Sequence, residues 1–388
     1  MPSLMTLRTL ATAVTLVAAT PLTVAPASAE TRPVVQTVLD ETVAAGIPGM
    51  VAEVRDSGRR TFAAAGVADT QSGRRRMPQE RFRVGSITKA FTATLVLQLA
   101  AERKLSLDDT VQTWLPGLVT GNGNDGSKIT IRQLLNQTSG LYNMYLDEKM
   151  LDKYSGPGFL EHRFDHVNPE ELIAVAMAYP PYFAPGTAFR YSNANYDLAG
   201  MIIEKATGTT YAEQLAGRIA RPLGLSGTYL PGKETRIRGP HPRHYSTLWS
   251  ADPDAKTYDV TEQNASYAWA AGGVVSTTGD LSRFLTALHD GTLLPPAQQK
   301  EIWNTTISTE GSAWIPGTRY GMGTWQQQLS CGQTVWGMGG AINGSYTYAM
   351  GSRDGKHTIV TNMNGDWNNP IAALTKAVET EFCPTATR

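Results

Sequence analysis

Several features that define common protein classes are scarce in this 388-residue chain. Basic and acidic residues balance at 34 each, so no positive excess is available to hold a phosphate backbone, which argues against nucleic-acid binding. Beyond a short run near the start, no stretch is apolar for long enough to anchor the chain in a membrane. The composition, 41% hydrophobic and 18% charged, is that of a globular protein with one large or two smaller domains.

Motifs of several enzyme classes are also missing. No G-x-S-x-G occurs, which argues against an α/β-hydrolase nucleophile elbow. The six histidines include no H-E-x-x-H, so a metal site has little support, and a Ser-His-Asp mechanism lacks a convincing histidine. Residues 121–126 match G-x-G-x-x-G, but no apolar strand precedes them and no helix follows, so we interpret them as a loop.

The first 29 residues have the features of a secretory signal peptide. Arg8 is their only charge, an apolar run covers residues 10–19, and residues 27–29 form a small-x-small cleavage site. The run is too short to span a bilayer comfortably. We therefore expect a secreted protein without a membrane anchor once residues 1–29 are removed. An uncleaved amphiphilic tail is the alternative.

Only two cysteines are present, Cys331 and Cys383. In an oxidising compartment two cysteines most simply pair with each other. Such a bridge would enclose about fifty residues, which corresponds to roughly 3–4 kcal/mol in the loop-entropy description. Two free buried thiols are the alternative.

The most informative motif is Ser86-Ile87-Thr88-Lys89, at the start of an apolar segment without Gly or Pro that predicts a helix over residues 87–105. Residues three apart share a helix face, so the lysine amine can lie beside the serine hydroxyl. A serine becomes a nucleophile when a neighbour takes its proton, and a lysine can do this only if its pKa is depressed. The alternative is an ordinary helix start with a solvated lysine.

Two further clusters combine polar or small residues. Tyr191-Ser192-Asn193 follows a turn at residues 185–186 and precedes a helical pattern. These three could provide a proton path and hold a carbonyl, or they could simply cap the helix. The second cluster, residues 336–341, reads Trp-Gly-Met-Gly-Gly-Ala. Its small residues would permit close approach of another backbone or a substrate, or form a plain hairpin turn.

The order of patterns predicts a sheet-and-helix domain that is built from both ends of the chain. A helical pattern over residues 31–45 precedes two strands around Asp56-Ser57-Gly58. Strand-like pieces return near the C-terminus, followed by a helix over residues 371–382. We expect residues 30–105 and 260–388 to form an α/β domain, and residues 106–259 to form an inserted, mostly helical one.

Taken in order, S-x-x-K, then Y-S-N, then a Gly-rich strand resemble the serine penicillin-recognising family, which includes class C β-lactamases, DD-carboxypeptidases, esterases and D-aminopeptidases. Exported DD-carboxypeptidases of the actinomycete type are the most similar kind. The resemblance implies the β-lactamase/DD-peptidase fold, a central antiparallel sheet flanked by helices with an inserted, mostly helical domain. Further matching blocks, which extend the resemblance over nearly the whole mature chain, are residues 81–86, 129–135, 138–141, 185–208, 271–277 and 280–281.

The resemblance also implies roles for individual residues. Ser86 would be acylated by the substrate, while Lys89 and Tyr191 would transfer its proton. Asn193 would hold the amide of the acyl side chain. The backbone N–H groups of Ser86 and Ala341 would form the oxyanion hole.

Other residues would complete the cleft. Trp269 would form one of its walls, and Gly340 would adjoin the oxyanion hole. The paired cysteines of the exported members correspond to Cys331 and Cys383. No cofactor and no metal are expected.

This chain departs from the family at the third motif. The family has His or Lys, then Thr or another small residue, then Gly, where this chain has Met338-Gly339-Gly340. A methionine can neither carry charge nor donate a strong hydrogen bond. Residues 324–328 also lack the arginine that such carboxypeptidases tend to use to hold a carboxylate, and Trp325 cannot replace it.

These departures favour a serine acyl-enzyme hydrolase or transacylase that acts on a small-molecule or peptide ester or amide without a free carboxylate at the leaving end. The first alternative is a D-alanyl-D-alanine carboxypeptidase. The second is a non-catalytic binding or sensor protein with the same fold. The sequence names neither the acyl donor and acceptor nor the oligomeric state.

Overall fold

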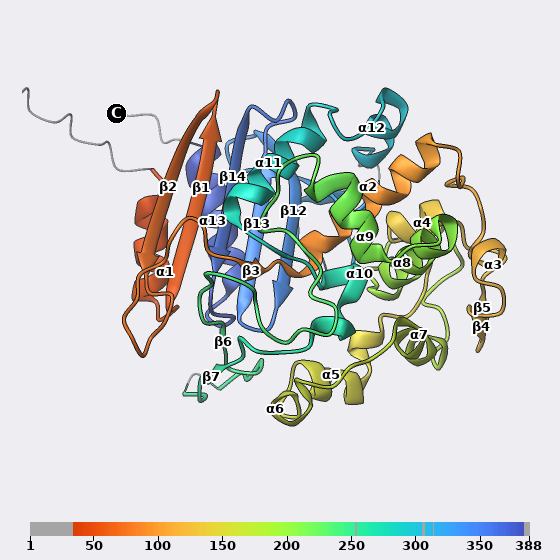
Figure 1. The fold of residues 1–388 in the computed structure, drawn as a ribbon, viewed down its shortest axis with the longest axis horizontal. Coiled ribbons are helices and arrows are strands. Elements are labelled where there is room, and N and C mark those ends of the chain that lie inside the picture. The colour runs from red at the N-terminus through yellow and green to blue at the C-terminus, as the bar shows by residue number, and fades with distance from the viewer. Residues whose placement is uncertain (1–33, 253, 305–306, 313, 384–388) are drawn as a thin grey trace, which may run out of the picture. The chain divides into compact units, whose positions relative to one another are not determined.

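An eight-stranded antiparallel sheet forms the centre of the protein in the computed structural model, which describes residues 34–252, 254–304, 307–312 and 314–383 (Figure 1). The predicted signal peptide lies outside the described residues. The strand order is β2-β1-β14-β13-β12-β11-β10-β9, so the first strand of the chain lies beside the last one. The bounds are β1 Gly49–Asp56, β2 Arg59–Gly66, β9 Ile307–Ser308, β10 Thr318–Tyr320, β11 Trp325–Gln328, β12 Thr334–Ile342, β13 Ser345–Gly351 and β14 His357–Met363.

The first hairpin confirms the predicted turn. Ser57 and Gly58 connect β1 to β2 with φ angles of 49° and 88°. Two consecutive positive φ angles are typical of the two-residue turn whose twist matches that of antiparallel strands. β1 is thereby held between β2 and β14, and seven of its residues pair with each neighbour in register.

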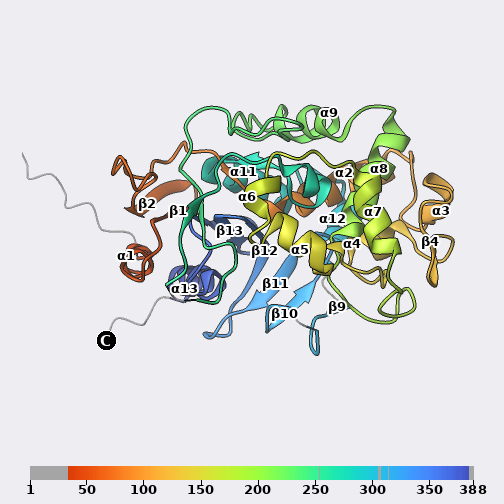
Figure 2. The same ribbon diagram turned by 90° about the horizontal axis from the view of Figure 1, so that it is seen from below.

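Helices cover both faces of the sheet (Figure 2). Helices α1 (Gln36–Ala44) and α13 (Pro370–Phe382) pack on one face, while α11 (Thr278–His289) packs on the other. Pro370 occupies the first helical position of α13, where its missing N–H costs no hydrogen bond, and the predicted C-terminal helix is confirmed. Each face has its own hydrophobic core.

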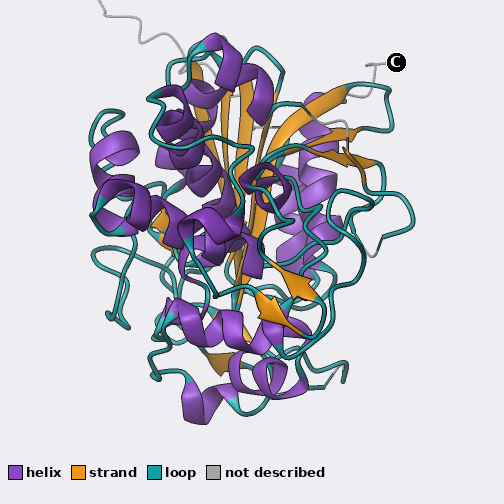
Figure 3. Cartoon of the chain, turned by 90° about the vertical axis from the view of Figure 1, so that its right-hand side faces the viewer, coloured by secondary structure: helices purple, strands orange, loops and turns teal. Residues whose placement is uncertain are grey.

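The remaining helices lie between β2 and β9 in the sequence and gather at one end of the sheet (Figure 3). Antiparallel sheet, flanking helices and helical insert confirm the predicted fold, while the domain boundaries at residues 105 and 260 stay a prediction. These helices are α2 Thr88–Ala101, α3 Val111–Trp114, α4 Ile131–Leu135, α5 Glu148–Tyr154, α6 Phe159–His162, α7 Pro169–Met177, α8 Ala194–Thr207, α9 Tyr211–Leu215, α10 Trp269–Gly272 and α12 Pro296–Ile302. Short pieces complete the fold: β3 Phe82–Arg83, β4 Thr120–Gly121, β5 Asn124–Asp125, β6 Tyr245–Ser246, β7 Tyr258–Asp259, β8 Val275–Ser276, η1 Gly85–Ile87, η2 Met144–Leu146, η3 Ala216–Ala220 and η4 Ala265–Tyr267.

Helix α2 is shorter than the predicted helix over residues 87–105. It ends at Ala101 because Arg103 adopts a left-handed φ of 57° and the Lys104 N–H turns back to the carbonyl of Leu99. The helix is buried on all sides over most of its length, since residues 88–97 are all buried. Among the described residues, no helix is both long enough and apolar enough to cross a bilayer.

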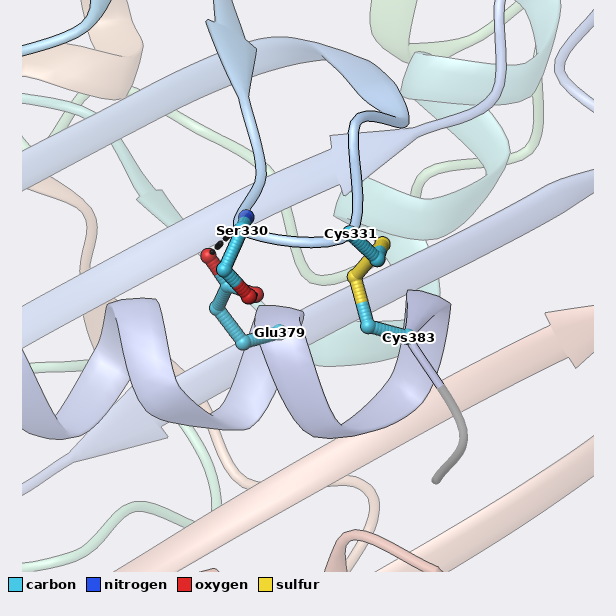
Figure 4. Close-up of a disulfide and its surroundings, with 4 residues drawn as sticks. All are labelled: Ser330, Cys331, Glu379 and Cys383. Atoms are coloured by element: carbon cyan, nitrogen blue, oxygen red, sulfur yellow. Dashed lines mark hydrogen bonds between the residues drawn. A yellow bond between two sulfur atoms is a disulfide. The ribbon is translucent and has the colours of Figure 1, made fainter. Parts of the chain in front are cut away.

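The predicted pairing of Cys331 with Cys383 is confirmed (Figure 4). The disulfide joins the turn between β11 and β12 to the end of α13, with the two Cα atoms 5.8 Å apart. Beside it, the backbone N–H and hydroxyl of Ser330 donate hydrogen bonds of 2.9 and 2.6 Å to the carboxylate of Glu379. Helix α13 is therefore attached to this turn at two neighbouring points.

Candidate active site

A close backbone contact positions the serine of the S-x-x-K motif. Gly85 has a φ of 53°, and a Cβ atom there would lie 2.5 Å from the carbonyl oxygen of Ala341. A Cβ atom on Gly340 would lie 2.0 Å from the carbonyl oxygen of Val84 and 2.6 Å from the Ser86 nitrogen. Only glycine fits at either position. Strand β12 thus lies directly against the turn, and Ser86 and Ala341 are brought together.

Lys89 lies beside the serine within the protein interior. The side chain is 1% exposed, and its Nζ is 3.2 Å from Ser86 Oγ. The same nitrogen donates 2.7 Å hydrogen bonds to Asn193 Oδ1 and to the carbonyl of Ala271. The side chains of Ser86 and Asn193 therefore both lie within hydrogen-bond distance of the Lys89 Nζ.

The surroundings of Lys89 favour its neutral form. Burial lowers its pKa to about 7, and the charge of Asp197 opposes this shift. The amine also faces the rings of Tyr191 and Tyr196, at 4.8 and 5.5 Å from their centroids. Because a pKa near 7 leaves a large neutral fraction at neutral pH, this lysine can accept a proton from a hydroxyl.

Tyr191 lies beside the same serine. Its hydroxyl is buried and, among the described residues, has no hydrogen bond of regular geometry, although it interacts with Ser86. Burial raises the pKa of Tyr191 well above its usual value, the neighbouring Tyr320 adds to the rise, and Ser86 opposes it. A phenol in this environment keeps its proton and can pass it on only as another arrives. The ring of Tyr191 stacks on Trp314, with centroids 4.5 Å apart.

Asn193 starts α8, but its side chain does not cap the helix. Its Nδ2 donates to Asn143 Oδ1 at 3.1 Å, while its Oδ1 accepts from Lys89. The sequence left helix capping open as the alternative for this cluster. Instead, the two contacts fix the amide orientation and point its oxygen at the lysine.

Two cavities adjoin Ser86, and Ser86 and Ala341 are the two residues that they share. The first, the helix-side cavity, has a volume of about 230 Å³ and is also lined by Tyr145, Leu151, Tyr154, Ser155, Asn193, Trp249, Tyr267, Ala268, Gly272, Ile342 and Asn343. The second, the sheet-side cavity, has a volume of about 420 Å³ and is also lined by Tyr191, Trp314, Ile315, Pro316, Trp325, Gly339, Gly340, Tyr346, Tyr348 and Ile371. A substrate whose carbonyl carbon lies at Ser86 would place one of the two groups attached to that carbon in each cavity.

Two predicted site residues are not brought to these cavities. Trp269 lines a separate cavity of about 840 Å³ that does not include Ser86, because its ring packs over Gly200 and against Tyr211. Met338 is fully buried in the hydrophobic core. Successive strand residues point to opposite faces, so Met338 faces the core where Gly339 faces the sheet-side cavity.

The sequence reading missed a buried acid next to the lysine. Asp197 lies one turn into α8, is fully buried, and neither carboxyl oxygen has a hydrogen bond of regular geometry among the described residues. Burial raises the pKa of Asp197 well above its usual value, while the charge of Lys89 and the N–H of Ala271 oppose the rise. The sequence does contain a signal for this residue, because Asp197 is an acid in a mostly apolar helical segment. Aspartates are rarely buried without a partner.

No histidine lines either cavity at Ser86. His244 and His289 are buried elsewhere, and burial lowers the pKa of His289 to about 4. The described residues contain no group of three or more His, Cys, Asp or Glu side chains placed to hold a metal ion. Among the described residues, Lys89 is therefore the base that lies within hydrogen-bond distance of Ser86 Oγ.

Comparison with known proteins agrees with this geometry. The Beta-lactamase family matches residues 35–381. A D-stereospecific amidohydrolase from Streptomyces sp. is 45% identical, with a TM-score of 0.84 over 91% of this chain and 99% of that one. D-amino acid amidase from Ochrobactrum anthropi SV3 is 27% identical, with a TM-score of 0.76 over 89% and 95%.

Two curated relatives match over less of their length. Esterase EstB from Burkholderia gladioli is 36% identical over 46% of this chain and 45% of the esterase. Protein flp from Staphylococcus aureus is 30% identical over 45% of this chain and 33% of that protein. The chain thus spans about a third to under a half of these relatives. Because the family match covers nearly all the described residues, this chain belongs to the Beta-lactamase family.

Proposed function

We propose that the protein is a serine acyl-enzyme hydrolase of amides or esters whose leaving group carries no carboxylate. The observation that carries this proposal is the 3.2 Å contact between Ser86 Oγ and a lysine whose pKa is lowered to about 7. A nucleophile next to a largely neutral base is the arrangement that acyl transfer requires.

The proposed reaction begins when neutral Lys89 takes the proton of Ser86 Oγ, as Oγ forms a bond to the substrate carbonyl carbon. The N–H groups of Ser86 and Ala341 bind the resulting oxyanion. The bond from that carbon to the leaving nitrogen or oxygen then breaks, and the proton on Lys89 reaches the leaving atom through Tyr191. The product at this stage is an ester of Ser86.

Water completes the cycle by the same groups. Its oxygen bonds to the acyl carbon, the ester bond to Ser86 Oγ breaks, and the water proton returns to Ser86 through Lys89 and Tyr191. An amine or alcohol in place of water would give acyl transfer instead, with the same atoms in the same roles. Hydrolysis and transfer are therefore two outcomes of one acyl-enzyme.

The lining of both cavities at Ser86 supports a leaving group without a carboxylate. Neither lining includes Lys, Arg or His. A buried carboxylate needs a cationic or multiple N–H partner to offset its desolvation. This observation counts against the D-alanyl-D-alanine carboxypeptidase alternative.

Similarity supports the acyl configuration. The structural neighbour that is 45% identical over nearly its full length is named a D-stereospecific amidohydrolase, and another is a D-amino acid amidase. We therefore extend the proposal to small amides and esters of D-configured acyl groups.

The test combines labelling with turnover. A fluorophosphonate should form one adduct on Ser86 of the wild type, and Ser86→Ala should abolish both the adduct and hydrolysis of D-aminoacyl amides and esters. The variant's unfolding transition should match the wild type's. Release of D-Ala from a diacyl tripeptide as the fastest reaction would favour the carboxypeptidase. A stable penicillin adduct without turnover of any substrate would favour a binding protein.

A further inference from the structure

The position of Tyr191 indicates which cavity receives the leaving group. A general acid must lie within reach of the atom that it protonates. Tyr191 lines the sheet-side cavity and not the helix-side cavity, whereas Asn193 lines only the helix-side cavity. The leaving group therefore enters the sheet-side cavity, and the acyl group enters the helix-side cavity.

Aromatic rings from separate segments build the sheet-side cavity. Trp314 stacks on Tyr191 and meets Trp325 edge-to-face, with centroids 4.5 and 5.8 Å apart. Trp325 in turn meets Tyr348 edge-to-face at 6.0 Å. Ile371 of α13 contributes to the remaining wall. Offset and edge-to-face ring contacts of this kind extend readily to one more ring.

The absence of a side chain at position 339 makes this arrangement possible. A Cβ atom on Gly339 would lie 2.6 Å from the ring of Tyr348 and 2.7 Å from that of Trp325. The rings thus occupy the space that a side chain at position 339 would fill. Gly339 pairs with Tyr348 across the strands, so this packing follows directly from the sheet register.

Two of the rings that line the cavity carry donors without acceptors. The indole N–H groups of Trp314 and Trp325 are buried and have no hydrogen-bond partner among the described residues. Trp325 is only 4% exposed. An unsatisfied buried donor costs free energy that an acceptor on a bound molecule would recover.

From these contacts we propose that the sheet-side cavity selects an uncharged aromatic leaving group that carries a hydrogen-bond acceptor, such as an ether or carbonyl oxygen. This inference rests on the proposed function, because it assigns the leaving group of that reaction. The ring would pack among Trp314, Trp325 and Tyr348, and the acceptor would pair with an indole N–H. Trp314, Trp325 and Gly339 are then the residues that determine leaving-group specificity.

The experiment holds the acyl group constant and varies the leaving alcohol. D-phenylalanine esters of 4-methoxybenzyl alcohol, benzyl alcohol, cyclohexylmethanol and glycolate share one acyl group, and each releases a primary alcohol when the bond between the acyl carbon and the ester oxygen breaks. We expect kcat/KM of the benzyl ester to exceed that of the cyclohexylmethyl ester about tenfold, with a further several-fold gain from the methoxy oxygen. The charged glycolate ester should be the poorest substrate.

Two variants test whether the sheet-side cavity is responsible for the preference between leaving alcohols. Trp314→Leu and Gly339→Ala should each reduce the benzyl preference, measured as the ratio of kcat/KM for the benzyl and cyclohexylmethyl esters in the same variant, to about twofold or less. The matched control, Trp249→Leu, removes an aromatic ring from the helix-side cavity and should change all four esters by the same factor. If either variant fails to fold, inhibition of the wild type by the free alcohols, 4-methoxybenzyl alcohol against cyclohexylmethanol, provides the same comparison.

The outcomes separate the two proposals. If the wild type hydrolyses all the neutral esters within about twofold of one another and both alcohols inhibit equally, the aromatic subsite is overturned while Ser86-dependent hydrolysis stands. If no ester or amide is turned over in a Ser86-dependent manner, the proposed function itself fails. A preference that survives in both variants would place the selection elsewhere and also overturn the assignment.

Discussion

The two cavities at Ser86 differ in how their polar groups are satisfied. In the helix-side cavity, the Trp249 indole donates to Asn343 Oδ1 at 3.2 Å, and Asn343 Nδ2 donates to the carbonyl of Tyr154 at 2.9 Å. Tyr145 donates to the carbonyl of Tyr267. In the sheet-side cavity, the corresponding groups of Tyr191, Trp314, Trp325 and Tyr348 lack regular hydrogen bonds among the described residues.

This difference suggests distinct roles for the two cavities in substrate binding. A paired polar group holds its side chain in one orientation and offers little to a ligand, whereas an unpaired buried donor is stabilised when a ligand supplies an acceptor. We interpret the helix-side cavity as a fixed support for the acyl group. The sheet-side cavity is where binding energy can still be gained, and therefore where substrates are distinguished.

The largest expected effect is that of Tyr191→Phe, which removes the proposed proton donor from the sheet-side cavity. We expect kcat/KM for amides to fall about 10²- to 10³-fold, and less for esters, whose leaving oxygen needs protonation less urgently. Tyr346→Phe, the same chemical change in the same cavity, is the control and should have little effect. Equal small losses in both variants would contradict the proton role.

A pair of stability measurements tests the contrast between paired and unpaired groups. Asn343→Leu removes two hydrogen bonds and leaves the Tyr154 carbonyl buried without its donor, so urea unfolding should show a loss of about 1–3 kcal/mol. Tyr348→Phe removes a hydroxyl without a regular hydrogen bond, although Thr375 lies close to it. Its free energy of unfolding should change by less than about 0.5 kcal/mol. Equal losses of unfolding free energy in the two variants would show that the paired and unpaired groups do not differ in their contribution to stability.

The smallest effect is expected from Asp197→Asn and appears in the pH profile. The charge of Asp197 raises the pKa of Lys89, which burial brings to about 7. Only neutral Lys89 can accept a proton, so kcat/KM should rise with pH through that pKa, and removing the charge should move this acidic limb to lower pH. Glu204→Gln, which changes another α8 carboxyl away from Ser86, should leave the limb in place. An unchanged limb in Asp197→Asn would limit Asp197 to packing.

Local patterns predicted the elements, and motif order predicted the centre of the site. The positive φ angles of a Ser-Gly turn and the proline at the start of α13 are set by neighbouring residues, so the sequence shows them. The S-x-x-K spacing on a helix likewise places Lys89 beside Ser86 without knowledge of the rest of the fold.

The cavity walls could not be predicted in the same way. Trp325, Gly339 and Tyr348 meet because β11, β12 and β13 pair in one register, and a slip of one residue would turn each side chain to the other face. The same alternation directs Met338 to the core, while the helical turn at α10 directs Trp269 to another cavity. Long-range register, which a single sequence does not encode locally, decides these positions.

Helix α13 connects the disulfide to the wall of the sheet-side cavity. One end carries Cys383, bound to the turn at Cys331, and the other end carries Ile371 in the wall of the sheet-side cavity. Ser86 and Lys89 belong to a different layer, on η1 and α2. Protein produced in a reducing cytoplasm would thus keep its nucleophile assembled while the wall above the leaving group loosens. If the proposed aromatic subsite is correct, recombinant material made without the cross-link would be less selective than material that carries it, so substrate profiles should be compared between the two preparations.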